Sequence, residues 1–138
     1  MRLWHVDLIE YLPNSQLVAQ WRELNSIFKK QDKHILINYI YEYKNKSVLY
    51  HYTQKVIDEL KARHYNIRSF ENMKNYFKGC VISNSAPDFL EHDFDYLTIC
   101  YYNLKEKYIR GQKDFTNSCW TKLERFYKNT KLEEMRNE

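Results

Sequence analysis

The chain has 138 residues, a net charge of +4 and 43% hydrophobic residues, which fits one folded domain and excludes a disordered chain. Two glycines and two prolines disfavour a turn-rich all-β fold and favour long helices. There is no apolar run of about 18 residues to cross a membrane, and charged residues near the N-terminus exclude a signal peptide. Cys80, Cys100 and Cys119 form no CxxC pair, so we expect reduced core thiols in an intracellular, cytoplasmic protein.

The first part of the chain is expected to be an extended lead-in followed by a helix. Apolar and polar residues alternate loosely over residues 3–9, as in an extended segment. Pro13 and Asn14 then mark a helix start. Arg22 and Glu23 lie outside the apolar stripe of this helix, so we expect them to face solvent, a groove or a ligand. The stripe consists of Leu17, Val18, Trp21, Leu24 and Phe28.

The middle of the chain gives a mixed signal. Residues 35–50 alternate as a strand would but lack a hairpin signal, so their structure is left open. A second helical stripe runs from Leu49 to Leu60. A short third helix over about residues 71–77 should end near Gly79, because glycine commonly follows a helix C-terminus.

Two further helices are expected in the last third. Ser85-Ala86-Pro87 should open a fourth helix, with proline in its first turn, that continues to about Ile109. Gly111 should break this helix, and a last one should begin at about Phe115. These patterns predict an all-α fold, a compact single domain over residues 1–138.

No metal or cofactor motif is present. The chain lacks HExxH, a phosphate loop, GxSxG and zinc-type spacing, so we expect no metal and no cofactor. Glu91, His92 and Asp95 would share a helix face, but acidic residues in a first helical turn are better explained by the helix dipole. His51 and His64 each stand alone and are interpreted as partly buried structural residues.

The N-terminus has chemistry of its own. Arginine at position 2 should leave Met1 in place, because methionine aminopeptidase prefers a small second residue. A free α-amine has a pKa of about 8, against about 10.4 for lysine, so far more of it is uncharged near neutral pH. Such an amine can attack a carbonyl-type carbon, such as C1′ of a deoxyribose, and form a Schiff base.

The segments MRLWHVDLIEYL and QLVAQWREL resemble the start of the pyrimidine-dimer DNA glycosylases/AP lyases, the phage-type endonuclease V family of base-excision repair. Residues 21–24 are similar to the family's tyrosine-arginine-glutamate-leucine motif, and Lys33-His34 to its lysine-histidine pair. Residues 62–67 match a later segment more loosely. The resemblance is strongest over residues 1–35 and thin after about residue 113, and it implies a single all-α domain of similar length.

The resemblance implies a DNA repair glycosylase with AP lyase activity. The α-amine of Met1 would attack C1′ of a damaged nucleotide, expel the base and form an imine. Glu23 would act as the acid/base and charge-stabilising residue, and β-elimination would cut the strand. The implied partner is double-stranded DNA with a damaged base or an abasic site, bound by a monomer that has no contact with membranes.

The resemblance also implies a set of DNA-binding residues. Arg2 takes the place of the arginine beside the nucleophile, and Arg22 that of a phosphate-holding arginine. Lys33 and His34 would add backbone contacts, which position a duplex without reading its sequence. The net positive charge permits this partner without requiring it.

The chain departs from the family pattern at several points. Met1 stands where the family has threonine, Gln16 where it has histidine, and Ser26 where it has a phosphate-binding arginine. The missing charge at Ser26 predicts weaker DNA affinity and a shallower salt dependence. The short aromatic-basic tail of phage members is replaced by a helix, so the lesion is left open.

Two alternatives remain open from the sequence. The first is a relative that binds DNA but has lost catalysis. The second is a protein-interaction domain in which Tyr39, Tyr41 and Tyr43 form the partner surface.

Overall fold

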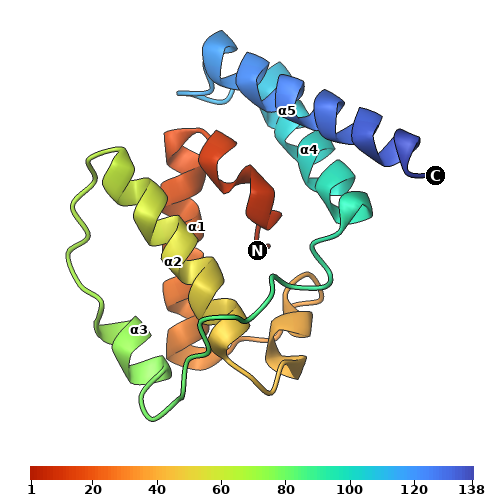
Figure 1. The fold of residues 1–138 in the computed structure, drawn as a ribbon. Coiled ribbons are helices and arrows are strands. Elements are labelled where there is room, and N and C mark those ends of the chain that lie inside the picture. Colours follow the sequence, from red (N-terminus) through yellow and green to blue (C-terminus); the bar gives the residue numbers. More distant parts are fainter.

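The regular structure of the chain is entirely helical (Figure 1). A computed structural model describes all 138 residues. In chain order its elements are the 3-10 helix η1 (Val6–Tyr11), α1 (Asn14–Lys30), the 3-10 helix η2 (Asn38–Glu42), α2 (Ser47–Ala62), α3 (Glu71–Tyr76), α4 (Phe94–Ile109) and α5 (Asn117–Arg136). The predicted all-α fold is confirmed. None of the helices combines the length and apolar character needed to span a membrane.

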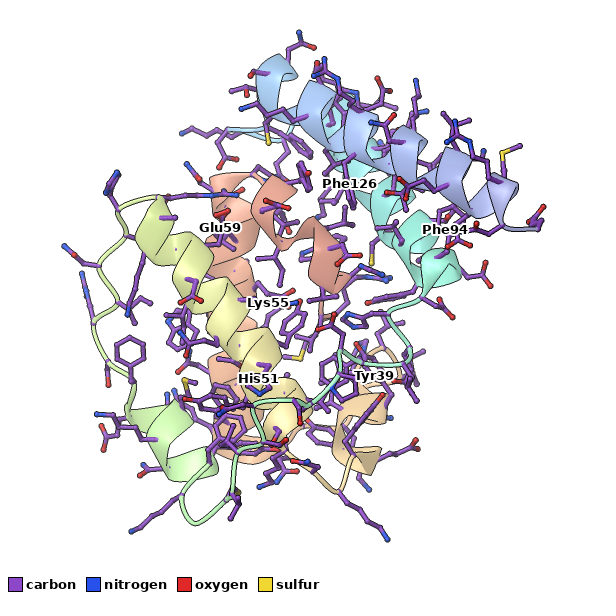
Figure 2. The ribbon with its side chains drawn as sticks, in the orientation of Figure 1. Tyr39, His51, Lys55, Glu59, Phe94 and Phe126 are labelled. Carbon is purple, nitrogen blue, oxygen red and sulfur yellow. The ribbon has the colours of Figure 1, made fainter.

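The helices form two layers with the N-terminal segment between them. Helix α1 packs against α2 and α3, while α4 and α5 form an antiparallel pair (Figure 1). Helix η1 contacts both α2 and α5. On the α5 side, the ring of Tyr11 stacks on Phe126 with centroids 4.7 Å apart (Figure 2). The N-terminal segment is therefore enclosed by both layers.

One continuous core joins the two layers. The predicted stripes of α1 and α2 are buried, with Leu17, Leu24 and Val56 fully inside. Leu104 of α4 and Leu123 of α5 belong to the same cluster. Burial of this apolar area drives folding and fixes the relative position of elements far apart in the sequence.

The extended lead-in is shorter than expected. The chain is non-helical only through His5, and η1 begins at Val6. The reason is local, because Nδ1 of His5 accepts the Asp7 N–H at 3.0 Å and caps the first turn. Residues 35–50 form a turn, η2 and the start of α2 rather than a strand. His64 lies beyond α2, exposed and with a φ of 66°, so its interpretation as a partly buried residue was wrong.

The fourth helix begins later than Ser85-Ala86-Pro87 predicts. It starts at Phe94, where the Asp93 carboxylate accepts the Tyr96 N–H at 2.9 Å. The preceding segment is tied to α2, because Ser83 N–H donates to Ser47 Oγ at 2.7 Å. Within the expected helix, Leu90 N–H donates to the Tyr43 hydroxyl at 2.9 Å instead of to a carbonyl one turn earlier, so tertiary contacts override the local proline signal.

The remaining helix ends follow the sequence closely. Gly79 and Gly111 both adopt positive φ values, 77° and 81°, after α3 and α4. Helix α5 starts at Asn117 after a Thr116 cap. The three cysteines are free, as expected, although only Cys100 is fully buried.

Candidate active site

The N-terminal segment is held in place by a buried glutamine on α1. Gln20 is 1% exposed and interrupts the apolar stripe of that helix. Its amide oxygen accepts the Trp4 N–H at 2.8 Å, and its amide nitrogen donates to the Arg2 carbonyl at 3.2 Å and to Glu23 Oε2 at 3.3 Å. The Tyr52 hydroxyl of α2 lies 2.6 Å from the Trp4 carbonyl and 3.1 Å from the Gln20 oxygen.

The opposite side of the segment is held from α4 and the loop before it. The Tyr96 hydroxyl donates to the Leu3 carbonyl, and Val6 N–H donates to His92 Nδ1 at 3.1 Å. Because Nδ1 accepts this hydrogen bond, the neutral His92 ring carries its hydrogen on Nε2. Nε2 lies 2.7 Å from the hydroxyl of Tyr39, which is labelled in Figure 2. Burial lowers the pKa of His92 to about 3, so it is neutral near pH 7.

The clamped segment brings the N-terminus to a small hollow beside α1. Met1 is 39% exposed at its edge. The hollow has a volume of about 230 Å³ and takes its walls from the N-terminal segment, α1, the turn before η2, and α4. Its lining residues are Met1, Arg2, Trp4, Gln16, Ala19, Gln20, Glu23, Leu36, Asn103 and Lys107.

Glu23 is a half-buried carboxylate in a positively charged setting. Burial raises its pKa, while the charge of the Met1 amine and the Arg2 backbone lower it. Lys107 of α4 acts in the same lowering direction. The five ion pairs of the chain lie elsewhere, so the amine and this carboxylate share the hollow without a salt bridge between them.

Arg2 lies inside the site rather than on its rim. Its guanidinium carbon is 5.9 Å from the Trp4 ring centroid and 5.8 Å from that of Tyr96. This placement over aromatic faces favours a fixed position by cation–π attraction. Arg2, which the sequence predicts to lie next to the nucleophile, is therefore held beside Met1 by these contacts.

The other predicted DNA-binding residues lie on the surface outside the hollow. Arg22 is exposed on α1, and Lys33 and His34 are exposed in the turn after it. The turn is rigid, because His34 Nδ1 accepts the Leu36 N–H at 3.2 Å while its own N–H donates to Asn38 Oδ1 at 2.7 Å. Leu36 of the same turn lines the hollow, as does Glu23, the neighbour of Arg22, so these side chains lie close to it in the chain.

Sequence reasoning missed three polar or charged residues of the site, Gln20, Asn103 and Lys107. Gln20 could have been found, because a polar side chain in the middle of an apolar stripe marks a buried hydrogen-bonding group. Asn103 and Lys107 are four residues apart on α4, so they share a helix face. Which face meets α1 depends on packing across the whole core and leaves no local signal.

A larger hollow lies between the start of α4 and the end of α5, with a volume of about 710 Å³. Acidic residues outnumber the single lysine of its lining and repel phosphate, so we do not assign it to nucleic acid. The acidic residues are Asp7, Asp93, Asp95, Glu134 and Glu138. Glu91 and His92 precede α4 instead of sharing a face with Asp95, and no group of three potential ligands is placed to hold a metal ion.

The three tyrosines of the interaction-domain alternative do not form a common surface. All are partly buried and bonded within the chain. Tyr39 contacts His92, the Tyr41 hydroxyl donates to the Asp32 carbonyl at 2.9 Å, and the Tyr43 hydroxyl donates to Glu91 at 2.6 Å. They stabilise η2 and the loop before α4.

Comparison with known proteins gives one match. The family model described as pyrimidine dimer DNA glycosylase matches residues 1–73, which is more than half of the chain. No curated protein and no solved structure matches significantly. The matched region contains every site residue predicted from the sequence, whereas Asn103 and Lys107 lie outside it.

Proposed function

Because the chain belongs to the pyrimidine dimer DNA glycosylase family, we propose that it is a DNA glycosylase with AP lyase activity, with the Met1 α-amine as nucleophile. The observation that supports this proposal most directly is the hollow shared by Met1 and Glu23. An amine and a half-buried carboxylate in one small site, without an ion pair between them, are the two groups that Schiff-base chemistry at a sugar carbon requires.

The proposed reaction starts at C1′ of a damaged nucleotide. The lone pair of the uncharged amine forms a bond to C1′, and the glycosidic bond breaks as its electron pair leaves with the base, which takes up a proton. The nitrogen then loses one proton, and its lone pair forms the C=N bond as the C1′–O4′ bond breaks and O4′ takes up a proton, which gives a protonated imine. Removal of a C2′ proton then expels the 3′ phosphate by β-elimination, and water hydrolyses the imine to release the amine.

Glu23 is assigned two tasks in this scheme. As a carboxylate it stabilises the positive charge that develops on the sugar during attack at C1′. It also accepts a proton from the attacking amine and passes it on as a general acid. Burial raises the pKa of Glu23 above its usual range, which favours uptake of the proton by the carboxylate.

DNA is proposed to approach along the positively charged rim. Arg2 and Lys107 lie in the hollow, with Arg22, Lys33 and His34 outside it. These cations would contact phosphates and position the strand without reading sequence. A hollow of about 230 Å³ is too small for a duplex, so the target nucleotide must leave the base stack to present its C1′.

Borohydride trapping tests the proposal. The untagged protein, with Met1 at its N-terminus verified by mass spectrometry, is incubated with a duplex that contains one abasic site and then reduced. We expect a covalent protein–DNA adduct and, without reductant, strand cleavage at the site. Salt-sensitive duplex binding without adduct or cleavage would contradict the proposal and identify a binding protein without catalysis.

A further inference from the structure

Gln20 is the feature of the site that neither the family match nor the proposed chemistry assigns to a task. It is the buried polar residue of α1, and its four hydrogen-bonding contacts all go to groups that hold or form the site. Transfer of an amide from water into an apolar core costs free energy unless its polar atoms form hydrogen bonds there. Here it is satisfied fully, and one of its partners is Glu23.

The orientation of the amide is determined by its partners. Trp4 N–H can only donate, so it must face the amide oxygen, and the Arg2 carbonyl can only accept, so it must face the amide nitrogen. The second hydrogen of the nitrogen then points to Glu23 Oε2. A flipped amide would break both backbone bonds, so the donor to Glu23 is locked.

We propose that Gln20 is a positioning residue that holds the Met1 amine and the Glu23 carboxylate in a fixed position relative to each other. One amide nitrogen holds the backbone next to the nucleophile, at the Arg2 carbonyl, and the carboxylate three residues along α1. The Gln20 side chain therefore links the backbone that carries the nucleophile directly to the carboxylate. This inference rests on the proposed function and specifies how its two catalytic groups are aligned.

The alignment matters because the reaction needs both groups at one carbon. Misplacement of a reacting group by about 1 Å costs on the order of 10²-fold in rate. The N-terminal segment has no helix of its own before Val6, so its position depends on side-chain bonds from other elements. Gln20 is the one that also contacts Glu23.

Two substitutions at this position separate positioning from simple stability. Gln20→Met keeps the length but removes every hydrogen bond, so we expect single-turnover cleavage of an abasic-site duplex to fall about 10²-fold at every pH. Gln20→Glu has the same shape, and while protonated it can still donate to Glu23. The protonated acid has one hydrogen and can serve Glu23 or the Arg2 carbonyl but not both, so we expect a rate between those of wild type and Gln20→Met at pH 5.5. Its ionisation places two acceptors against each other, so the rate relative to wild type should fall further as the pH rises.

Tyr52→Phe is the matched control. It removes the hydroxyl that contacts the Gln20 oxygen and the Trp4 carbonyl, so it weakens the same buried network without touching Glu23. We expect a smaller fall in melting temperature than in Gln20→Met, with a wild-type pH profile and a rate within about threefold of wild type, because the loss of one hydroxyl leaves the amide donor in place.

A second measurement does not depend on activity. Loss of a hydrogen bond to a carboxylate disfavours its charged form, so NMR titration of the Glu23 carboxyl carbon should show a higher pKa in Gln20→Met than in wild type, but not in Tyr52→Phe. Unchanged titration in folded Gln20→Met, or identical pH–rate profiles in all variants, would overturn the inference. Failure of the wild-type protein to cleave would instead reject the proposed function, and the titration would still decide the role of Gln20.

Discussion

Replacement of His92 by glutamine tests whether the N-terminal segment is held by a neutral imidazole. His92 is 8% exposed, accepts the Val6 N–H, and contacts the Tyr39 hydroxyl through its other nitrogen. Glutamine can accept from the same N–H and donate to the same hydroxyl, but it does not titrate. The substitution therefore keeps the contacts and removes the pH dependence that His92 gives to stability.

The size of the effect follows from the pKa of His92. Burial lowers it to about 3 in the folded protein, against 6.5 for a model histidine. Below pH 6.5 His92 is protonated in the unfolded chain but stays neutral in the folded chain, so the free energy of unfolding falls as the pH falls toward 3. At about 1.4 kcal/mol per pH unit, this amounts to about 2 kcal/mol between pH 7 and pH 5. An unfolding entropy of about 2 cal/mol/K per residue converts this into about 7 °C of melting temperature.

The assay is thermal unfolding followed by circular dichroism at pH 7, 6 and 5. The melting temperature of the wild-type protein should fall between pH 7 and pH 5 by about 7 °C more than that of His92→Gln. Replacement of the exposed His64 by glutamine serves as the control and should keep the wild-type slope, because the His64 ring makes no hydrogen bond within the chain. Burial lowers the pKa of the neighbouring His5 as well, so part of the acid sensitivity should persist in His92→Gln. Parallel curves for wild type and His92→Gln would refute the reasoning.

Two further predictions concern the hollow itself. Glu23→Gln should slow base release and strand cleavage by about 10²–10⁴-fold, while duplex affinity measured by fluorescence anisotropy stays within about twofold, because the carboxylate acts mainly in the transition state. An equal loss of affinity would show that Glu23 only binds. Lys107→Met removes a cation from the lining and should reduce the salt dependence of duplex binding by about one phosphate contact. Lys128 is paired with Glu124 on the exposed side of α5, so Lys128→Met should leave that salt dependence unchanged. An equal effect of the two substitutions would contradict the proposed approach of DNA past Lys107.

Local signals predicted much of α1 and little of what surrounds it. The apolar spacing from Leu17 to Phe28 placed Glu23 off the buried stripe, and the structure has it half-buried at the edge of the hollow. Gly79 and Gly111 marked helix ends because only glycine adopts positive φ without strain. These features depend on residues within one or two turns of each other.

The errors and omissions share a physical cause, which is contact between distant parts of the chain. Pro87 fits the first turn of a helix, yet Leu90 N–H bonds to the Tyr43 hydroxyl and α4 begins only at Phe94. Lys107 enters the site only because the pair α4–α5 packs across the N-terminal segment (Figure 1). Such placements follow from the arrangement of the whole core and are not encoded in a short window of sequence.

The most direct test of the central claim is to map the borohydride-trapped adduct to a residue. The reduced complex of untagged protein and abasic-site duplex is digested with nuclease and protease, and the sugar remnant is located by tandem mass spectrometry. The account predicts a single modification, on the α-amine of Met1, and none after that amine is blocked by an N-terminal extension. Modification of a lysine side chain in place of Met1, or undiminished trapping by the extended protein, would contradict it.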